Sequence, residues 1–455
     1  MLQKLTLPFL IILVILGAVL RSYNLPGRAT FEWDQERDHQ AVTAMVTAVK
    51  PPLVGPVIQG QGGFMLGPLY YYLLTPSYLL LSGNPLSSFY LSIFLDLVLV
   101  LGLYFLGNRY LGRPAGLIAG LLWVFSAYAI RLSLVSWNVS LVPLYTLGSL
   151  GLGLALHQSF RLRYFWAALF WLGLAWHVHP SVIFQIPVAL LLSWPHLRPL
   201  SPKAWLLGLG CFLLPLSPWA IFDLRHSFTN TKLLFGFLSQ SSVPSALGAT
   251  LVSIWQKYAF ELSQLLVGRQ LFALGSVLII GELVYLLFSR KYISRFLGLN
   301  LVFSFLALLL MRNEDFGNYY LLNLAIINVW LIVDLLHSYR APLRWGLLIG
   351  FLLLNLKQYN FTTGPYSLAV KQEVLTTIAA WHNPVDLEIS LPVGRRSAFD
   401  WYLVHSSILR HDDNARDVAY IVESDQLEIT APEKARSIVI EQTIGGFRFV
   451  GYQGY

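Results

Sequence analysis

Cysteine and charged side chains are both scarce in this chain of 455 residues. The one cysteine, Cys211, lies inside an apolar run, so neither an intramolecular disulfide nor a zinc site built from cysteines can organise the fold. Only 12% of the residues are charged and 56% are hydrophobic, with a net charge of +8. The basic residues are spread over many short loops and form no stripe, which excludes a nucleic-acid-binding protein and fits a membrane topology.

Apolar runs of about 16 to 20 residues recur along the first three quarters of the chain, which is the pattern of a polytopic membrane protein. Hydropathy predicts about eleven spans, and the first is expected to be an uncleaved helix with Lys4 on the cytoplasmic side. The predicted spans lie near residues 6 to 22, 86 to 107, 114 to 130, 139 to 156, 164 to 179, 181 to 195, 204 to 222, 271 to 289, 296 to 311, 320 to 337 and 342 to 356.

The segment GPLYYYLLTPSYLLLSG, residues 67 to 83, is apolar enough to be a further span. We interpret it as an interfacial helix, because its tyrosines favour the headgroup level and because a crossing here would invert every later basic loop. In the resulting topology the basic loops all face the cytoplasm. Their residues are Arg109, Arg113, Arg161, Arg163, Arg198, Lys203, Arg290, Lys291, Arg295, Arg340 and Arg344.

Three external segments are too long to be simple connectors: residues 23 to 85, residues 223 to 270, and the tail from 357 to 455. In the tail, YSLAVKQEVLTTIAAW predicts an amphipathic helix, while DLEISL, VAYIVES, LEITAP and ARSIVIEQ alternate as strands do. The predicted fold is therefore an all-α polytopic membrane domain, residues 1 to 356, followed by a small extracytoplasmic α+β domain.

The stretch FEWDQERDHQ, residues 31 to 40, concentrates four carboxylates beside the membrane. In a helix Asp34 and Asp38 would share one face, as would Glu32 and Glu36, and such a cluster needs a compensating cation, arginine or substrate. The flanking Phe31 and Trp33 would hold it at headgroup depth. A lipid-linked sugar phosphate presents its reactive carbon at that depth, and a positioned aspartate there can act as a general base on an acceptor hydroxyl.

Several segments resemble the GT-C glycosyltransferases, and among them the branch of protein O-mannosyltransferases and lipid A aminoarabinose transferases. The resemblance covers residues 1 to 356. It is carried by FEWDQERDHQAV, GPLYYYLL, SAYAIRLSLVSWNVSLVPLY, AWHVHP, SPWAIFDLRHSFTNTK and FGNYYLLNL, in this order. It implies an inverting transferase that uses a polyprenyl-phosphate sugar donor at the extracytoplasmic face of the plasma (inner) membrane. The acceptor would be a hydroxyl of a protein, lipid or glycan.

The resemblance also implies roles for particular residues. The essential aspartate of the family falls on Asp34, with Gln35 in place of the usual glutamate and Arg37 matching the arginine. Asn138 stands where a second acidic residue commonly follows the third span, which weakens a two-carboxylate metal site and leaves the use of a divalent cation open, with Asp34 as its ligand if one binds. The lysine that some relatives carry before the tyrosine-rich stretch is replaced by Leu66.

Other residues are candidates for contacts with the substrates. Arg131 and Arg225 with His226 are candidates for the phosphate, because a guanidinium can donate two parallel hydrogen bonds to it. Arg131 also fits a snorkelling anchor, and Asp223 is a possible partner of Arg225. Candidates for other contacts are Glu32, Glu36, Arg37, Asn138, His177, His179, Tyr319 and Tyr320. The histidines also fit ordinary hydrogen-bonded side chains, and the tyrosines also fit interfacial anchors.

Two other classes of protein share this composition. A transporter or flippase of lipid-linked sugars would carry ionisable residues within its spans, such as Asp96, Glu282 and Asp334. A membrane receptor or assembly factor would depend on its tail domain, so that deleting residues 360 to 455 would abolish its function, whereas a transferase could keep its chemistry.

Overall fold

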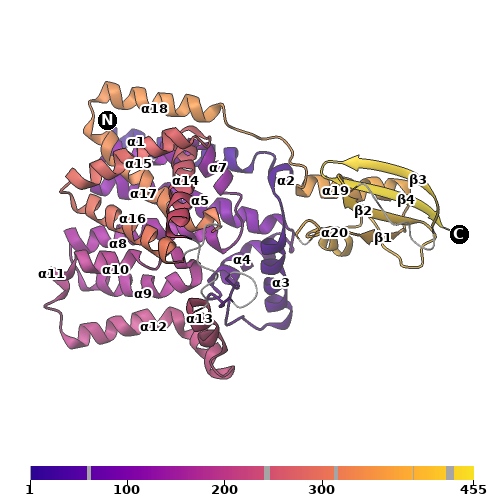
Figure 1. Cartoon of the computed structure of the whole chain (residues 1–455), viewed down its shortest axis with the longest axis horizontal. Helices are drawn as coiled ribbons and strands as arrows, with labels where there is room; N and C mark the ends of the chain where they lie inside the picture. Colours follow the sequence, from indigo (N-terminus) through magenta and orange to yellow (C-terminus); the bar gives the residue numbers. More distant parts are fainter. Residues whose placement is uncertain are drawn as a thin grey trace. The chain divides into compact units, whose positions relative to one another are not determined.

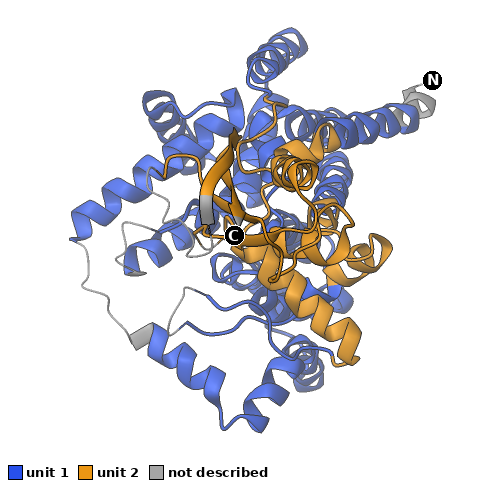
Figure 2. Ribbon diagram, turned by 90° about the vertical axis from the view of Figure 1, so that its right-hand side faces the viewer, with its two compact units in different colours: residues 1–20, 51–72, 92–359 blue, residues 21–50, 73–91, 360–455 orange. Residues whose placement is uncertain are grey.

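The computed structural model describes residues 2–58, 63–239, 246–311, 316–392, 394–426 and 435–454. Their contacts divide the chain into two compact units, which are coloured separately in Figure 2. The membrane unit comprises residues 1–20, 51–72 and 92–359. The loop–tail unit comprises residues 21–50, 73–91 and 360–455, so that two parts of the first long loop share one unit with the tail.

Helices build the membrane unit, and each of the predicted spans coincides with one or more of them (Figure 1). They are α1 (Leu2–Ser22), α5 (Leu86–Tyr110), α6 (Arg113–Phe125), α7 (Ala127–Leu132), α8 (Val142–Gln158), α9 (Leu162–Val178), α10 (Gln185–Leu192), α11 (Trp194–Leu197), α12 (Pro202–Arg225), α13 (Thr229–Ser239), α14 (Leu247–Val267), α15 (Phe272–Phe288), α16 (Tyr292–Met311), α17 (Leu322–Ser338) and α18 (Ala341–Leu356). Short 3-10 turns precede three helices: η1 (Asn138–Leu141), η2 (Pro180–Val182) and η3 (Asn318–Leu321).

Within the described residues, five helices are long and apolar enough to cross a membrane, and a sixth span results if α14 and α15, which meet at a 94° bend, count as one. Four shorter apolar helices accompany them. The core of the unit lies around α17, where Trp330 is buried, and α6, where Trp123 donates a hydrogen bond to Asp96 at 2.7 Å. By contrast, α12 is mostly exposed, as expected of a helix that faces lipid.

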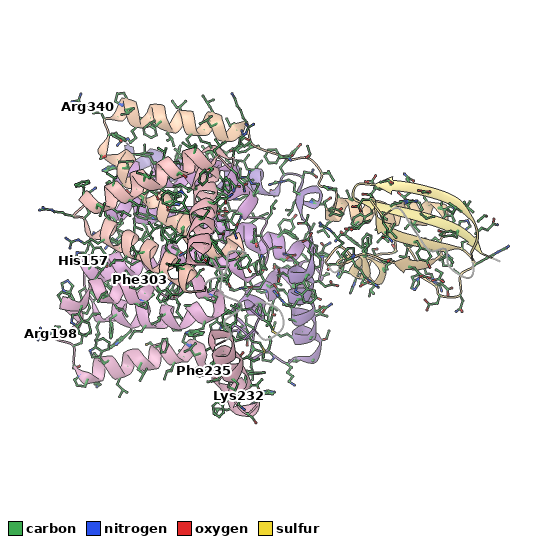
Figure 3. The ribbon with its side chains drawn as sticks, in the orientation of Figure 1. His157, Arg198, Lys232, Phe235, Phe303 and Arg340 are labelled. Carbon is green, nitrogen blue, oxygen red and sulfur yellow. The ribbon has the colours of Figure 1, made fainter. Side chains whose placement is uncertain are left out.

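The predicted basic loops can be followed in Figure 3, where Arg340, Arg198 and His157 lie at the same end of the membrane unit. Arg340 precedes α18, Arg198 follows α11, and His157 is at the end of α8. Three loops that the topology assigns to one side therefore lie at one end of the unit in this view. This agrees with the alternation of the predicted spans.

Two predicted external segments have more structure than a loop. The segment 67 to 83 forms α4 (Leu69–Leu80), which has 12 residues. Its length is about 18 Å, too short for a hydrocarbon core of about 30 Å, and this supports the interfacial interpretation. The segment 223 to 270 contains α13 and the 21-residue α14, so most of its described residues are helical.

The tail folds as a mixed sheet with helices, as the sequence predicts. The amphipathic helix is α19 (Leu368–Trp381), and three predicted strands are β1 (Asp386–Ile389), β2 (Val418–Glu423) and β3 (Ala435–Ile444). The predicted strand LEITAP, residues 427 to 432, lies outside the described residues. Two further elements are α20 (Phe399–His405) and β4 (Phe447–Gly454). The sequence does not predict β4, because glycines such as Gly451, which packs on the Trp381 ring, interrupt its alternation.

The sheet has the order β1-β2-β4-β3, with β1 parallel to β2 and the other pairs antiparallel. Two helices from the first loop, α2 (Leu25–Arg28) and α3 (Trp33–Ala48), belong to the same unit. The side chain of Asn24 donates to the carbonyl of Phe361 at 2.8 Å, and Tyr23 packs edge-on against the Phe361 ring. The unit therefore joins residues that are more than 300 positions apart in the sequence.

A close helix contact shapes the bend between α14 and α15. A Cβ atom built on Gly275 would lie 1.9 Å from the carbonyl oxygen of Ala259, so the two backbones touch and only glycine fits. Gly281 is on the same helix, and a Cβ built there would meet nothing within 4 Å. Gly275 is therefore packed against a neighbouring backbone, whereas Gly281, on the same helix, has open space beside it.

We expect Gly275→Ala to lower the thermal unfolding midpoint of the detergent-solubilised protein, because the added methyl group must push α14 away from α15. The cost should be about 1 to 3 kcal/mol. The control Gly281→Ala should leave the midpoint unchanged or raise it slightly, since alanine favours helix by up to about 1 kcal/mol. Equal midpoints for the two variants would contradict this account of the bend.

Candidate functional site

The acidic cluster forms the first turns of α3. Glu32 is the N-cap of α3, and a capping box stabilises this start of the helix. The side chain of Glu32 accepts a hydrogen bond from the backbone of Gln35, and the Gln35 side chain accepts one from the Glu32 N–H at 3.0 Å. Gln35 thus has a structural use where relatives are expected to have glutamate. Asp34 and Glu36 lie in the first turn, where the positive end of the helix dipole stabilises negative charge.

Arg37 bridges two carboxylates on one face of α3. Its Nη1 donates to Asp34 at 2.7 Å, while Nη2 and Nε both donate to one oxygen of Asp38, at 2.7 and 2.9 Å. The prediction that Asp34 and Asp38 share a helical face is thus confirmed. The guanidinium compensates the repulsion between the two acids, and its planar fork fixes their positions.

The two aspartates differ in their environment. Asp38 is fully buried, and its Oδ2 has no hydrogen-bond partner among the described residues. Burial raises the pKa of Asp38 to about 7, against the attraction of Arg37. Asp34 is one-third exposed. Burial raises its pKa above 3.8, and Arg37 limits the rise. Asp34 is therefore the accessible member of the pair, and it is a stronger base than an ordinary aspartate.

The other two acids of the cluster bind the tail. Glu32 forms an ion pair with Arg395 at 2.5 Å, and Glu36 accepts a hydrogen bond from the hydroxyl of Ser397. The predicted sharing of a face by Glu32 and Glu36 therefore agrees with the structure. Both side chains contact the tail, whereas Asp34 contacts Arg37 of its own helix and is one-third exposed.

His39 anchors the buried side of α3 and was not singled out by the sequence. Its Nε2 lies 3.2 Å from the hydroxyl of Ser87, and its ring packs edge-on against Phe31 and Tyr78. One turn later, the hydroxyls of Thr43 and Tyr78 are 2.7 Å apart. Burial lowers the pKa of His39 to about 4, so the ring is neutral at pH 7 and acts as a packing and hydrogen-bonding group.

In the membrane unit, the predicted histidines and tyrosines gather near the ends of α9 and η3. His177 accepts from the Leu69 N–H at 3.3 Å, and its Nε2 lies 2.7 Å from the carbonyl of Pro215. The ring of His179 packs edge-on against Tyr320 at 4.7 Å and Tyr319 at 5.5 Å. His179 and the two tyrosines thus form one aromatic cluster, while His177 ties α9 to its neighbours.

Asn138 lies in the same part of the membrane unit, at the start of η1. Its Nδ2 donates to the carbonyl of Val178 at 2.8 Å, and its buried Oδ1 has no hydrogen-bond partner among the described residues. An orphaned buried oxygen carries a free-energy cost and commonly marks a place where a water, ion or ligand group belongs. The role of Asn138 as a substrate contact stays a prediction.

The arginines predicted to contact the phosphate lie on different helices, α7 and α12. Arg131, in α7, donates to the side chain of Gln264 at 3.2 Å and the carbonyl of Gly268 at 3.3 Å, so it ties α7 to the end of α14. Arg225 and His226 are exposed at the end of α12. Asp223 instead caps α13, since its carboxylate accepts from the backbone and side-chain groups at the start of that helix.

A mostly apolar cavity of about 340 Å³ lies within the membrane unit beside the aromatic cluster. Tyr320 is part of its wall, and the polar groups at its border come from Ser181 and Ser304. Its lining residues are Phe64, Leu66, Ala175, Trp176, Pro180, Ser181, Ile183, Phe184, Leu234, Phe237, Ser304, Ala307, Leu308 and Tyr320. Its size and apolar wall suit a small apolar segment of a ligand.

Among the described residues, one group has the ligand types of a metal site: Asp386, His411 and Asp413 in the tail. The Leu387 N–H donates to Nδ1 of His411 at 3.1 Å, while Nε2 lies 2.9 Å from Asp413. A neutral ring that accepts at Nδ1 must carry its proton on Nε2, so neither nitrogen has a lone pair for a metal. His411 thus links the Leu387 N–H to the carboxylate of Asp413. A cation held by Asp34 stays a prediction.

Lys371 and Arg395 are contacts of the acidic helix that the sequence analysis missed. Lys371 could have been found from the sequence, because its spacing places it on the apolar face of α19 together with Leu368, Leu375 and Ile378. A lysine at such a position indicates a buried partner. No local pattern identifies Arg395, because its acidic partner is 363 positions away.

We expect Arg37→Met to destabilise the protein by about 3 kcal/mol, because it leaves Asp38 buried without its cation. Thermal unfolding in detergent measures this, and adding Asp38→Asn should recover part of the loss. Arg396→Met is the control, since its pair with Asp400 is half exposed and is worth less than about 1 kcal/mol. Similar losses for the two arginine variants would contradict the bridging role.

Comparisons with known proteins find a related sequence region and similar folds. The sequence model of the family described as dolichyl-phosphate-mannose-protein mannosyltransferase matches residues 66–222. No curated protein matches the chain by sequence. Among solved structures, ArnT from Cupriavidus metallidurans bound to undecaprenyl phosphate superposes with a TM-score of 0.65 at 12% identity, and each chain is covered over 98% of its length.

ArnT from the same organism in the apo state has a TM-score of 0.60 at 12% identity, again over 98% of both chains. The oligosaccharyltransferase of Archaeoglobus fulgidus, in complex with Zn and sulfate, has a TM-score of 0.49 at 15% identity, over 89% of this chain and 58% of that one. The predicted resemblance to GT-C glycosyltransferases is confirmed. The chain is a multi-pass integral membrane protein with the fold of ArnT, including a small mixed sheet near its C-terminus.

Proposed function

We propose that this protein is an inverting glycosyltransferase that uses a polyprenyl-phosphate sugar donor. The observation that carries the proposal is the state of Asp34: it is an accessible carboxylate at a helix N-terminus, and Arg37 holds it against a buried second acid. The fold of ArnT and the mannosyltransferase region at residues 66–222 support the same reaction class.

In the proposed reaction, Asp34 removes the proton from an acceptor hydroxyl as the hydroxyl oxygen attacks the anomeric carbon of the sugar. The new glycosidic bond forms on the face opposite the phosphate, the bond from the anomeric carbon to the phosphate oxygen breaks, and polyprenyl phosphate leaves with that electron pair. The phosphate is already a good leaving group, so the base on the acceptor supplies the main help. Arg131 and Arg225 stabilise the negative charge on the phosphate.

The predicted substrate contacts fit different parts of the reaction. His177, His179, Asn138, Tyr319 and Tyr320 would contact the carrier or acceptor from the membrane unit. The apolar cavity beside Tyr320 suits an apolar stretch of a ligand. The acceptor would be a hydroxyl of a protein, lipid or glycan, and Arg37, Glu32 and Glu36 would shape the site around Asp34.

The ionisable residues within the spans favour a transferase over a flippase. Asp96 accepts from Trp123, Glu282 accepts from the hydroxyl of Tyr258 at 2.7 Å, and Asp334 pairs with Lys291 at 2.7 Å. Each of these acids already has a partner, as in a structural role. A transport pathway would instead need ionisable groups that exchange partners along a route.

We also propose that α3 and the tail lie on the extracytoplasmic face of the plasma (inner) membrane, with the N-terminus in the cytoplasm. The distribution of lysine and arginine in the short loops supports this orientation.

Replacing Asp34 by asparagine should lower transfer by about 10² to 10⁴ fold, because the amide cannot accept the proton. The product is first identified by mass spectrometry of lipid and protein glycans after deletion of the gene. Wild type, Asp34→Asn and the control Asp400→Asn, an exposed acid of the tail, are then compared for restoration of that product. Full restoration by Asp34→Asn at a normal protein level would disprove the mechanism.

A cysteine at Gln40, which is exposed on α3, should react with a membrane-impermeant maleimide in intact cells when Cys211 is replaced by serine. The same reagent should leave a cysteine at Arg198 unlabelled until the cells are opened, because the proposed topology places that loop in the cytoplasm. The reverse pattern would overturn the proposed orientation.

A further inference from the structure

A buried lysine of the tail contacts the backbone beside the acidic helix. Lys371, in α19, is only 1% exposed. Its Nζ donates to the carbonyl of Phe31 at 2.9 Å and to the carbonyl of Ser397 at 2.6 Å. Phe31 directly precedes Glu32, the N-cap of α3, so one amine joins the start of this helix to the loop before α20.

A buried amine is costly unless it is well bonded, so this contact requires an explanation. Burial lowers the pKa of Lys371 to about 7, while the nearby Glu32 and Glu36 act in the opposite direction. The ring of Phe399 lies 5.8 Å from Nζ. A leucine or methionine would suit the apolar face of α19 at lower cost. The amine is needed because two carbonyls converge on it.

Two side chains of the adjoining loop bind the acids of α3 themselves. Arg395 pairs with Glu32 at 2.5 Å, its guanidinium covers the Tyr366 ring at 3.7 Å, and Glu423 lies 3.8 Å from its Nε. Ser397 donates to Glu36. Glu32 and Glu36 flank Asp34 in the sequence, so the tail binds the acid on each side of it.

Main-chain hydrogen bonds also join the tail to the segment that precedes α3. The Gly364 N–H donates to the carbonyl of Gly27 at 2.7 Å, and the Leu368 N–H donates to the carbonyl of Ala29 at 2.9 Å. These bonds fix the segment that leads into Phe31. All of these contacts lie within the loop–tail unit, which contains α3, α19 and the sheet. Figure 1 labels these elements.

We propose that the tail positions the acidic helix for sugar transfer, with Lys371 and Arg395 as positioning residues that hold the N-terminus of α3 and thereby the carboxylate of Asp34. This inference rests on the proposed function. It gives the tail a role in the reaction without contact to the reacting atoms. It also means that deletion of residues 360 to 455 cannot separate a transferase from a receptor, because either would lose its function.

Neighbouring arginines provide the test. Arg395→Met removes the pair with Glu32 and keeps the apolar stem, whereas Arg396→Met removes an exposed pair with Asp400. We expect Arg395→Met to lower the kcat for the identified sugar product about 10-fold with little change in KM, since a small misplacement of a catalytic group has an effect of this order or larger. Arg395→Lys should restore part of the rate, and Arg396→Met should match wild type.

A double-mutant cycle tests whether Arg395 acts through Glu32. The double variant Arg395→Met with Glu32→Gln should be no slower than the slower single variant, because both substitutions remove one interaction. Additive losses would show that Arg395 acts elsewhere and would overturn this part of the proposal.

A measurement independent of activity completes the test. Hydrogen exchange of the amides at the start of α3 should be faster in Lys371→Met and Arg395→Met, while exchange in α17 stays at the wild-type level. Faster exchange in α17 as well would indicate general destabilisation and would count against a positioning role.

The outcomes separate the two proposals. If Asp34→Asn is inactive while Arg395→Met and Lys371→Met keep the wild-type rate, the positioning role is wrong and the proposed function stands. If Asp34→Asn keeps the product, the proposed mechanism itself fails, whatever the tail variants do.

Discussion

The charge balance at the start of α3 is the constraint on which the proposed chemistry depends. Four carboxylates within seven residues would repel one another and resist any partial burial. Arg37 compensates two of them, and the tail supplies partners for the other two through Arg395 and Ser397. The four acids therefore have different surroundings: Asp38 is buried, Glu32 and Glu36 contact groups of the tail, and Asp34 is one-third exposed beside Arg37. The same residue types in an open loop would give four equivalent solvated acids.

Local patterns account for the part of the fold that was predictable. Apolar runs locate every predicted span on a helix, and alternation locates β1, β2 and β3, because both signals depend only on which side of an element is buried. The sequence does not predict β4, since Gly451 and Gly454 interrupt its alternation and its register depends on cross-strand partners such as Tyr420 in β2 and Gln442 in β3. α14 was assigned to a loop because it mixes Gln256, Lys257 and Glu261 into an apolar stretch.

The candidate site, like the fold, has features that local sequence predicts and features that depend on long-range packing. Asp34 and Arg37 were predictable because their spacing and sequence context are local. The burial of Asp38 was not, since it depends on what covers the helix, and the engagement of Glu32 and Glu36 depends on residues of the tail. In the membrane unit, His179, Tyr319 and Tyr320 were selected as separate pairs, and only the folded chain brings their rings together. Sequence spacing selected the candidate residues, and long-range packing decided which of them are accessible.

The attachment of the tail has a consequence for biosynthesis. The partners of Glu32 and Glu36 are 363 and 361 positions downstream, so the first hydrophilic loop leaves the ribosome long before the groups that will complete it. During most of translation its acids have no cation other than Arg37, and Phe31 lacks the donor that later meets its carbonyl. A truncated product from which the last hundred residues are missing would keep its spans and still contain an unfinished loop. The order of synthesis therefore ties the ordering of this loop to completion of the whole polypeptide.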